Sequence, residues 1–220
     1  MGLLDGLRQV LGLQAESDAT SDADPEDLFG MTTAYLTMEA DLGYEPVGAA
    51  ALCFSEVDST DFEDTVHEVE DILEAGREET GTVAELTADD HGYHWVVLED
   101  PDFEDLVTSV HFAADTFVER GYGSRLLAAV FGFRKGETTS RSRSRDGEPI
   151  EAADEGQRVY WIYSFRRGAY YPFAPAAGHE RDSQVELKLQ SNLDGELAIE
   201  DDTAYWYPLW PERRGGHPWG

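Results

Sequence analysis

The spacing of apolar residues along the chain predicts an alternation of helices and strands. The predicted helices, where apolar side chains recur every three or four positions, run over residues 26–43, 61–75, 101–121 and 183–193. The predicted strands, which are continuous or alternating apolar runs, cover residues 47–54, 82–86, 93–98, 126–133 and 159–165. About five mostly antiparallel strands and three to four helices predict a single α+β domain.

The amino-terminal segment has a pattern of its own. Residues 1–13 predict a short amphipathic helix with one apolar face, formed by Leu3, Leu4, Leu7, Val10 and Leu11. Residues 14–25 contain mainly Ala, Ser, Thr, Asp and Glu, and we expect a flexible acidic tether there. Docking of the helix on a membrane is the weaker interpretation, because its polar face carries Asp5 and a single Arg8.

The rest of the chain is assigned to one domain and a tail. We expect the α+β domain to cover residues 26–212, with a charged loop at 136–157, and the tail to cover residues 213–220. The aromatic residues between Tyr205 and Trp210 should pack on the body of this domain.

The charge of the chain points to its solvent. The sequence has 46 acidic and 16 basic side chains and a formal net charge of -30. In molar salt the Debye length falls to about 3 Å, which screens the repulsion between carboxylates. A hydrophobic content of 41% argues against intrinsic disorder. We therefore expect a folded protein of a high-salt cytoplasm, and no nucleic-acid partner, because phosphate would be repelled.

Membrane insertion and disulfide chemistry are not expected. No apolar stretch reaches the roughly 18 residues that span a bilayer, so no integral membrane segment is predicted. The amino terminus lacks the pattern of a secretory signal. The single cysteine, Cys53, excludes an internal disulfide and is expected to be a small buried hydrophobic residue.

Motifs for catalysis are sparse. The chain has no Gly-x-Ser-x-Gly elbow and no phosphate-binding loop, and we expect no catalytic residue, no metal site and no cofactor. The alternative is a metal- or nucleotide-dependent hydrolase with a site near His91 and His94. These two histidines fall on a predicted turn and strand, where a spacing of three does not converge on one metal ion.

One segment combines arginines with aromatic residues in a predicted turn. Arg166 and Arg167 precede Tyr170, Tyr171 and Phe173. Arginine and tyrosine are common anchors of protein interfaces, so we expect these five residues and the apolar face of residues 1–13 to bind a partner. The structural alternative is that the aromatic turn covers the core.

Another run of arginines lies in the charged loop. Three of them, at positions 141, 143 and 145, could contact phosphate groups. We favour a simple loop that offsets the acidic field locally, because so small a patch makes a weak contact at high salt.

Several segments together carry a family resemblance. They are residues 1–5, 43–48 with Cys53-Phe54, 92–97, 131–133, 160–175 and 205–210. In these segments the chain resembles the PspA-associated protein PspAB family. The resemblance implies a non-enzymatic accessory protein of the phage-shock envelope-stress response, with a PspA-like coiled-coil protein as partner and membrane contact only through that partner. The order of elements is also similar to that of small α+β chaperones that hold secretion-system clients.

Overall fold

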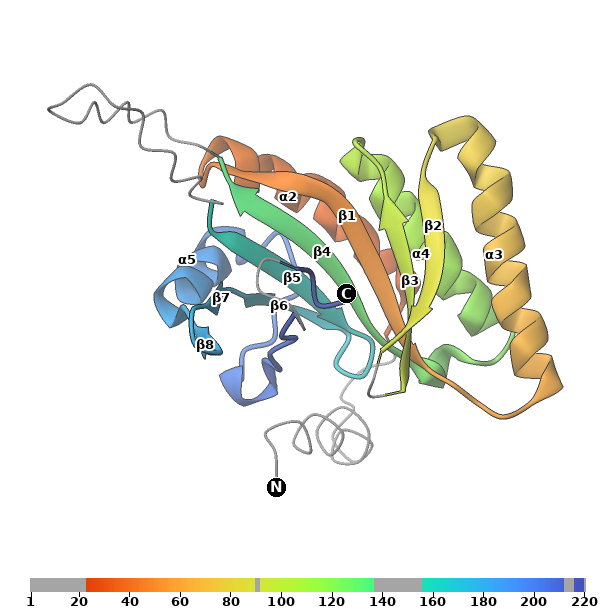
Figure 1. Cartoon of the computed structure of the whole chain (residues 1–220). Helices are drawn as coiled ribbons and strands as arrows, with labels where there is room; N and C mark the ends of the chain where they lie inside the picture. The colour runs from red at the N-terminus through yellow and green to blue at the C-terminus, as the bar shows by residue number, and fades with distance from the viewer. Residues whose placement is uncertain (1–22, 90–91, 137–155, 212–215, 220) are drawn as a thin grey trace, which may run out of the picture.

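A single antiparallel sheet of six strands forms the centre of the described chain. The computed structural model describes residues 23–89, 92–136, 156–211 and 216–219. Within these ranges the strand order is β2-β3-β1-β4-β5-β6 (Figure 1). The strands are β1 (Tyr44–Ser55), β2 (Val83–Ala88), β3 (Tyr93–Glu99), β4 (Leu126–Lys135), β5 (Arg158–Ser164) and β6 (Ala169–Phe173). The predicted α+β class is confirmed.

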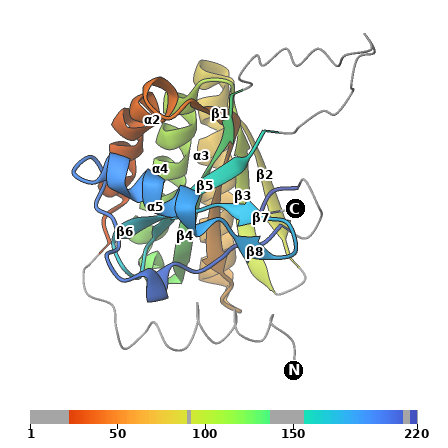
Figure 2. The same cartoon turned by 90° about the vertical axis from the view of Figure 1, so that its left-hand side faces the viewer.

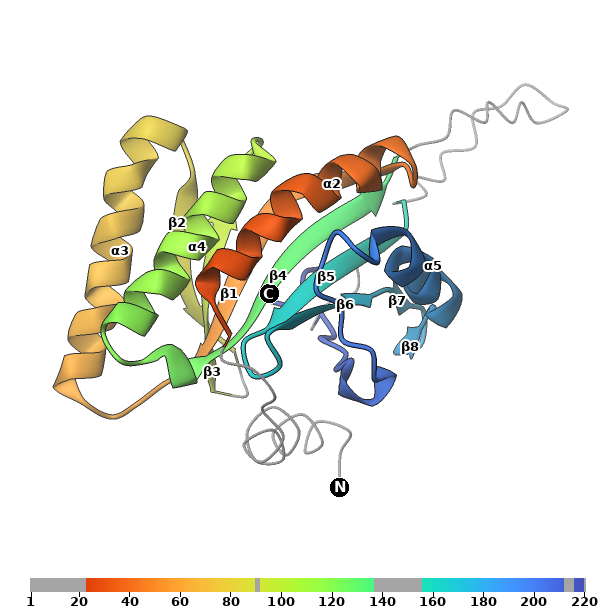
Figure 3. The ribbon, with the colours of Figure 1, turned by 180° about the vertical axis from the view of Figure 1, so that it is seen from behind.

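Three helices cover one face of the sheet. They lie side by side in the order α3, α4, α2 (Figure 3). Their bounds are α2 (Met31–Ala40), α3 (Thr60–Thr80) and α4 (Phe103–Glu119), and the short 3-10 helix η2 (Pro25–Gly30) leads into α2. Phe117 of α4 lies 4.8 Å from Phe54 of β1 and 6.0 Å from Phe62 of α3 between ring centroids. The apolar stripe of each helix is therefore buried against the sheet.

The opposite face of the sheet is covered by the carboxyl-terminal residues from Trp206 onward, whereas Leu189 and Leu193 of the helix before them belong to the core on the helix side. Helix α5 (Ser183–Leu193) lies near the β6 edge (Figure 2), beside a small pair of strands, β7 (Pro175–Ala176) and β8 (Glu180–Arg181). The chain then returns over the sheet, where Trp206 and Leu209 are buried in a second apolar cluster. The expectation that these carboxyl-terminal aromatic residues pack on the body is confirmed for Trp206.

The second apolar cluster, which contains Trp206 and Leu209, also contains the cysteine. Cys53 is 3% exposed and pairs with Trp95 of β3 in the register of the sheet. Burial raises the pKa of its thiol well above the usual value, so the thiolate is disfavoured. The predicted role of Cys53 as a small buried hydrophobic residue is confirmed.

Two sequence-based boundaries around the first strand need correction. The first predicted helix begins as η2 and becomes α-helical only at Met31. Strand β1 starts at Tyr44, before the predicted residue 47, and includes Pro46. The pairing of β1 with β4 shifts register between Pro46 and Ala50, and Gly48 has a φ of +72° there, so a bulge accommodates the proline.

The predicted turn after β5 also contains a strand. Residues 169–173 form β6, which pairs with β5 from Tyr160–Phe173 to Ser164–Ala169. Proline at position 172 had favoured a turn, but β6 is the last strand of the sheet, where one side needs no ladder hydrogen bond. The sheet therefore has six strands where the sequence predicted about five.

The prediction that Gly76 ends the second helix was wrong. Helix α3 continues through Gly76 to Thr80, and its C-cap is Gly81, with a φ of +89°. Gly81 takes the left-handed conformation that commonly ends a helix, whereas Gly76 is a glycine inside the helix.

No helix in the described ranges has the length and apolarity required to cross a membrane.

The two glycines predict opposite effects of the same substitution. Gly76→Ala should raise the free energy of unfolding by about 0.5–1 kcal/mol, because a Cβ there meets no atom within 4 Å and alanine favours the helix. Gly81→Ala should lower it by about 1 kcal/mol, because alanine resists a positive φ. Denaturant titration of both variants in the same molar salt measures the difference, and effects of equal sign would contradict this helix end.

Candidate functional site

The two arginines singled out from the sequence lie in the tight turn that joins β5 to β6. The backbone N–H groups of Arg167 and Gly168 both donate to the carbonyl oxygen of Ser164, at 3.1 and 2.8 Å. Gly168 has a φ of +58°, which closes the turn. This hairpin end holds both arginines where β5 and β6 finish.

Arg167 is engaged with the carboxyl-terminal segment. Its Nε donates to Oε2 of Glu200 at 2.6 Å, and the two side chains are only 12% and 9% exposed. Its guanidinium also lies over the ring of Tyr205, 4.0 Å from the centroid. A nearly buried, charge-assisted pair of this kind fixes the segment after β6 to the hairpin.

Arg166 has no such partner. Its side chain is half-buried, and its Nε is buried without a hydrogen-bond acceptor. Strand β4 begins beside the end of β5, because the N–H of Phe165 donates to the carbonyl of Leu127 at 3.2 Å. Arg125 immediately precedes β4. Arg125 is exposed and, in the described part of the chain, forms no ion pair. We call Arg125 and Arg166 the arginine corner.

The start of the described chain is fixed beside the same hairpin end. Tyr163, near the end of β5, donates from its hydroxyl to Oδ2 of Asp27 at 2.8 Å. Tyr170, near the start of β6, donates to the carbonyl of Leu28 at 3.2 Å. Burial, reinforced by the bond to Asp27, raises the pKa of Tyr163 and keeps this donor neutral. The arm that precedes Asp24 therefore joins the body close to the arginine corner.

The apolar residues predicted to contact a partner precede the described chain. Residues 1–22 lie outside the described ranges, and with them the predicted contact residues Leu3, Leu4, Leu7, Val10 and Leu11. His91 and positions 137–155 of the charged loop, with Arg141, Arg143 and Arg145, also lie outside the described ranges.

The three aromatic residues of the predicted interface have a different place. Tyr170, Tyr171 and Phe173 are 1%, 2% and 0% exposed. Tyr170 faces the helix layer, while Tyr171 and Phe173 face the carboxyl-terminal segment, because side chains alternate along a strand covered on both faces. The expectation that these rings contact a partner is corrected: they belong to the core, as the structural alternative had it.

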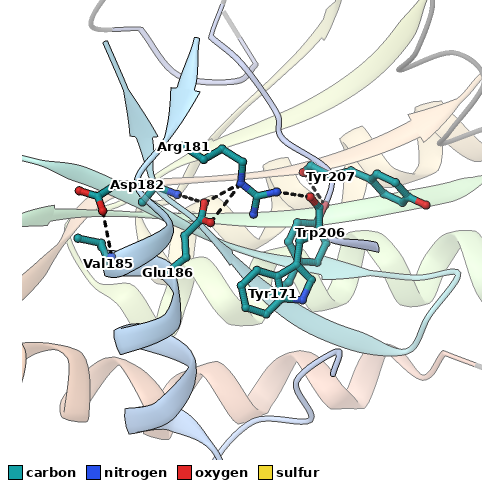
Figure 4. Close-up of polar contacts among 8 residues, drawn as sticks. Tyr171, Arg181, Asp182, Val185, Glu186, Trp206 and Tyr207 are labelled. Atoms are coloured by element: carbon teal, nitrogen blue, oxygen red, sulfur yellow. Dashed lines mark hydrogen bonds and ion pairs between the residues drawn. The ribbon is translucent and has the colours of Figure 1, made fainter. Parts of the chain in front are cut away.

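A second ion pair, between half-buried Arg181 and buried Glu186, holds the same segment at Trp206, and sequence reasoning missed it. The Nε of Arg181 donates to both carboxylate oxygens of Glu186, at 2.9 and 3.1 Å, and its Nη1 donates to the carbonyl of Trp206 at 2.6 Å (Figure 4). The hydroxyl of Tyr171 donates to the carbonyl of Tyr207 nearby. In so acidic a sequence, a glutamate near an arginine carries no signal, and the partners come together only through the tertiary fold.

The described end of the chain also packs on the sheet. The ring of His217 stacks on Trp219 at 4.6 Å between centroids and lies edge-on to Tyr160 of β5. Arg158 donates to the carbonyl of Gly216 at 3.2 Å. Burial, with the positive charge of Arg158, lowers the pKa of His217 to about 4.

The histidine site of the hydrolase alternative gains no support. His94 is half-buried, and its Nε2 lies 3.1 Å from Oε2 of Glu56, an exposed carboxylate. Among the described residues no three His, Cys, Asp or Glu side chains are grouped so that they could hold a metal ion. The contacts of His94 account for it as a surface histidine beside an acidic residue.

These features define an α+β protein whose antiparallel sheet is covered by helices on one face and by a pinned carboxyl-terminal segment on the other. A family model described as PspAB, PspA associated protein B, matches residues 1–219. The chain belongs to this family, as the resemblance of its sequence had indicated. The family's name associates it with PspA, and the search of curated proteins gave no match.

The contrast between buried and exposed ion pairs gives a stability prediction. Arg167→Gln should lower the free energy of unfolding by about 3 kcal/mol, because Glu200 would stay buried without its cation. Arg77→Gln removes an exposed pair with Glu74 and should change it by less than about 0.5 kcal/mol. Denaturant titrations of the two variants compare these effects, and similar losses would show that the Arg167 pair does not anchor the segment.

The lowered pKa of His217 predicts a pH dependence. The unfolded chain, with a histidine pKa near 6.5, binds this proton more readily than the folded chain does. The contribution of neutral His217 to stability should be complete above about pH 6.5 and decline as the pH falls towards 4. His217→Gln should flatten the stability curve in this window, as measured by denaturation at several pH values. Parallel curves for the two proteins would contradict it.

Proposed function

We propose that this protein is a non-enzymatic accessory protein of a PspA-type envelope-stress response. It binds PspA or a related helical, coiled-coil partner in a high-salt cytoplasm, and any contact with a membrane goes through that partner. The observation that carries this proposal is the family match over residues 1–219.

The proposed binding surface is the hairpin end with Arg166, together with the apolar face of residues 1–13. Arg167, which the sequence also nominated, holds that hairpin end in place through its pair with Glu200. The support for this surface is that the described chain begins within hydrogen-bond distance of the last residues of β5, so the arm and the hairpin can act on one partner. The buried rings of Tyr170, Tyr171 and Phe173 pack in the core below the hairpin end and hold it in place. The sequence had predicted that they would contact the partner directly.

The chemistry of this surface suits a helical partner. A helix of a coiled coil carries acidic residues beside its apolar seam, and guanidinium groups form hydrogen-bonded pairs with carboxylates. An apolar helix face of about two turns can pack on such a seam. In a protein with a net charge of -30, local arginines are needed to receive an acidic helix.

The test is capture of the partner from stressed cells in buffer of molar salt, with the tagged full chain as bait. The full chain should retain a PspA homologue. Removal of residues 1–13, or Arg166→Ser, should reduce the retained amount roughly tenfold, which corresponds to about 1.4 kcal/mol of binding free energy.

Arg77→Ser is the matched control, because it removes the same charge from the exposed end of α3. It should leave capture unchanged. Failure of the full chain to retain any PspA homologue, under conditions that preserve other complexes, would refute the proposed function. Equal losses for Arg166→Ser and Arg77→Ser would refute the proposed surface.

A further inference from the structure

The two edges of the central sheet end in different ways. At the β6 edge, the N–H of Tyr170 donates to the carbonyl of Ala198 at 2.7 Å. The carbonyl of Tyr170 accepts from the N–H of Glu200 at 2.8 Å, and Pro172 has no N–H to offer. The chain after α5 therefore occupies the β6 edge. At the opposite edge, β2 pairs with β3 and, in the described ranges, with no further strand.

The register of β2 shows which of its backbone groups stay free. The N–H of Asp89 donates to the carbonyl of Tyr93 at 2.9 Å, which makes these two residues a hydrogen-bonded pair at the end of the β2–β3 ladder. Such pairs alternate along antiparallel strands, so the backbone groups of the odd-numbered residues of β2 face β3. Those of Ala84, Leu86 and Ala88 face away from the sheet and have no hydrogen-bond partner in the part of the chain that the structure describes. We call these outward groups the β2 edge.

The β2 edge lacks the features that usually block the addition of a strand. β2 contains neither proline nor lysine, and its pairing with β3 runs over all six residues without a shift of register. An uninterrupted row of free N–H and C=O groups is a template for one more strand. Val83 is 43% exposed, and Ala84 and Leu86 are only partly buried. An added strand would therefore cover apolar side chains as well.

Helix α3 decides what can occupy this edge. It contacts β2 and is the outermost element on that side of the sheet (Figures 1 and 3). Paired β2 strands of two copies would lie about 4.8 Å apart, which would bring their α3 helices closer than the roughly 8–10 Å that packed helices need. A second copy of the chain therefore does not fit, whereas an extended peptide without a helix does.

The side chains beside the edge set the composition of such a peptide. Ala84 and Leu86 pack on the helix side of the sheet, so the peptide residues that face α3 should be apolar. On the opposite face Glu85 is exposed, and like charges on neighbouring strands destabilise a sheet. The peptide residues on that face should therefore be polar or basic.

We propose that the β2 edge binds an extended segment of a partner protein, in which apolar residues alternate with polar or basic ones. The segment adds a seventh strand to the six-stranded sheet, below α3. Hydrogen bonds to the outward groups of Ala84, Leu86 and Ala88 supply the affinity, and the alternating side chains supply the specificity. The proposal goes beyond the proposed function, because it concerns another surface and an extended ligand, so either can fail without the other.

The test is a titration of the isotope-labelled full chain with the peptide acetyl-KVTVKV-amide in molar KCl, followed by amide NMR signals. Salt at this concentration screens charge attraction, so binding reports hydrogen bonds and apolar contact. The amide signals of Ala84, Leu86 and Ala88 should shift. At a peptide concentration of about ten times Kd their solvent exchange should slow roughly tenfold, because only the unbound tenth of the protein then exchanges. Exchange of the odd-numbered amides of β2, which are bonded to β3, should change little.

The matched control is the same peptide with N-methyl groups on its two central residues. These groups remove one donor from each edge of the peptide and keep its charge and side chains, so the exchange of the β2 amides should not slow. In the protein, Ala84→Pro removes one outward N–H and leaves the bonds to β3 in place, and it should weaken binding of the unmodified peptide roughly tenfold. The N-methyl control keeps the test decisive if this variant does not fold.

Three results would overturn the proposal. No shift of the three outward amides would show that the edge does not bind the peptide, and equal effects of both peptides would show side-chain contact without an added strand. Slow exchange of the same amides in the peptide-free protein would show that the chain itself already covers the edge or, where the slowing grows with protein concentration, that a second copy does.

Discussion

Burial of the central sheet on both of its faces is the constraint on which the rest of this structure depends. Along β5, Trp161 faces the helix layer and Tyr160 faces the carboxyl-terminal segment, and both are almost completely buried. A strand of this kind has no polar face, so each face of the sheet needs a cover. The three helices provide one cover, and the chain after α5 provides the other.

The second cover has little regular structure, and ion pairs hold it in place. Arg181 fixes the carbonyl of Trp206 while it is paired with Glu186, and Arg167 is paired with Glu200. A charge taken out of water needs both its counter-ion and its hydrogen bonds. Moving either guanidinium away from its partner would leave a buried carboxylate unpaired, so the segment is held in one position. The two ion pairs turn an irregular segment into a specific part of the core.

The same logic separates two kinds of arginine at the hairpin end. Arg167 is committed to the fold through Glu200, while Arg166, its neighbour in sequence, is left with a buried donor and no acceptor. Adjacent residues in a turn point in different directions, and here one direction meets a carboxylate and the other does not. The first described residues of the chain, Asp24 and Asp27, are bonded to Tyr163 beside the same hairpin end.

Hydrophobic periodicity is a local property, and it was enough to predict the α+β class, the order of the elements through β5 and the bounds of α5. The sequence also carried the family, through segments spread over the whole chain. It could not distinguish Gly76 from Gly81 as the end of α3, since packing decides how far a helix continues. Nor could it tell that Tyr170, Tyr171 and Phe173 are core residues while Arg166 keeps an unpaired donor. These outcomes depend on which segment covers each face of the sheet and on which carboxylate reaches each arginine, and both are set by tertiary packing between residues far apart in the sequence.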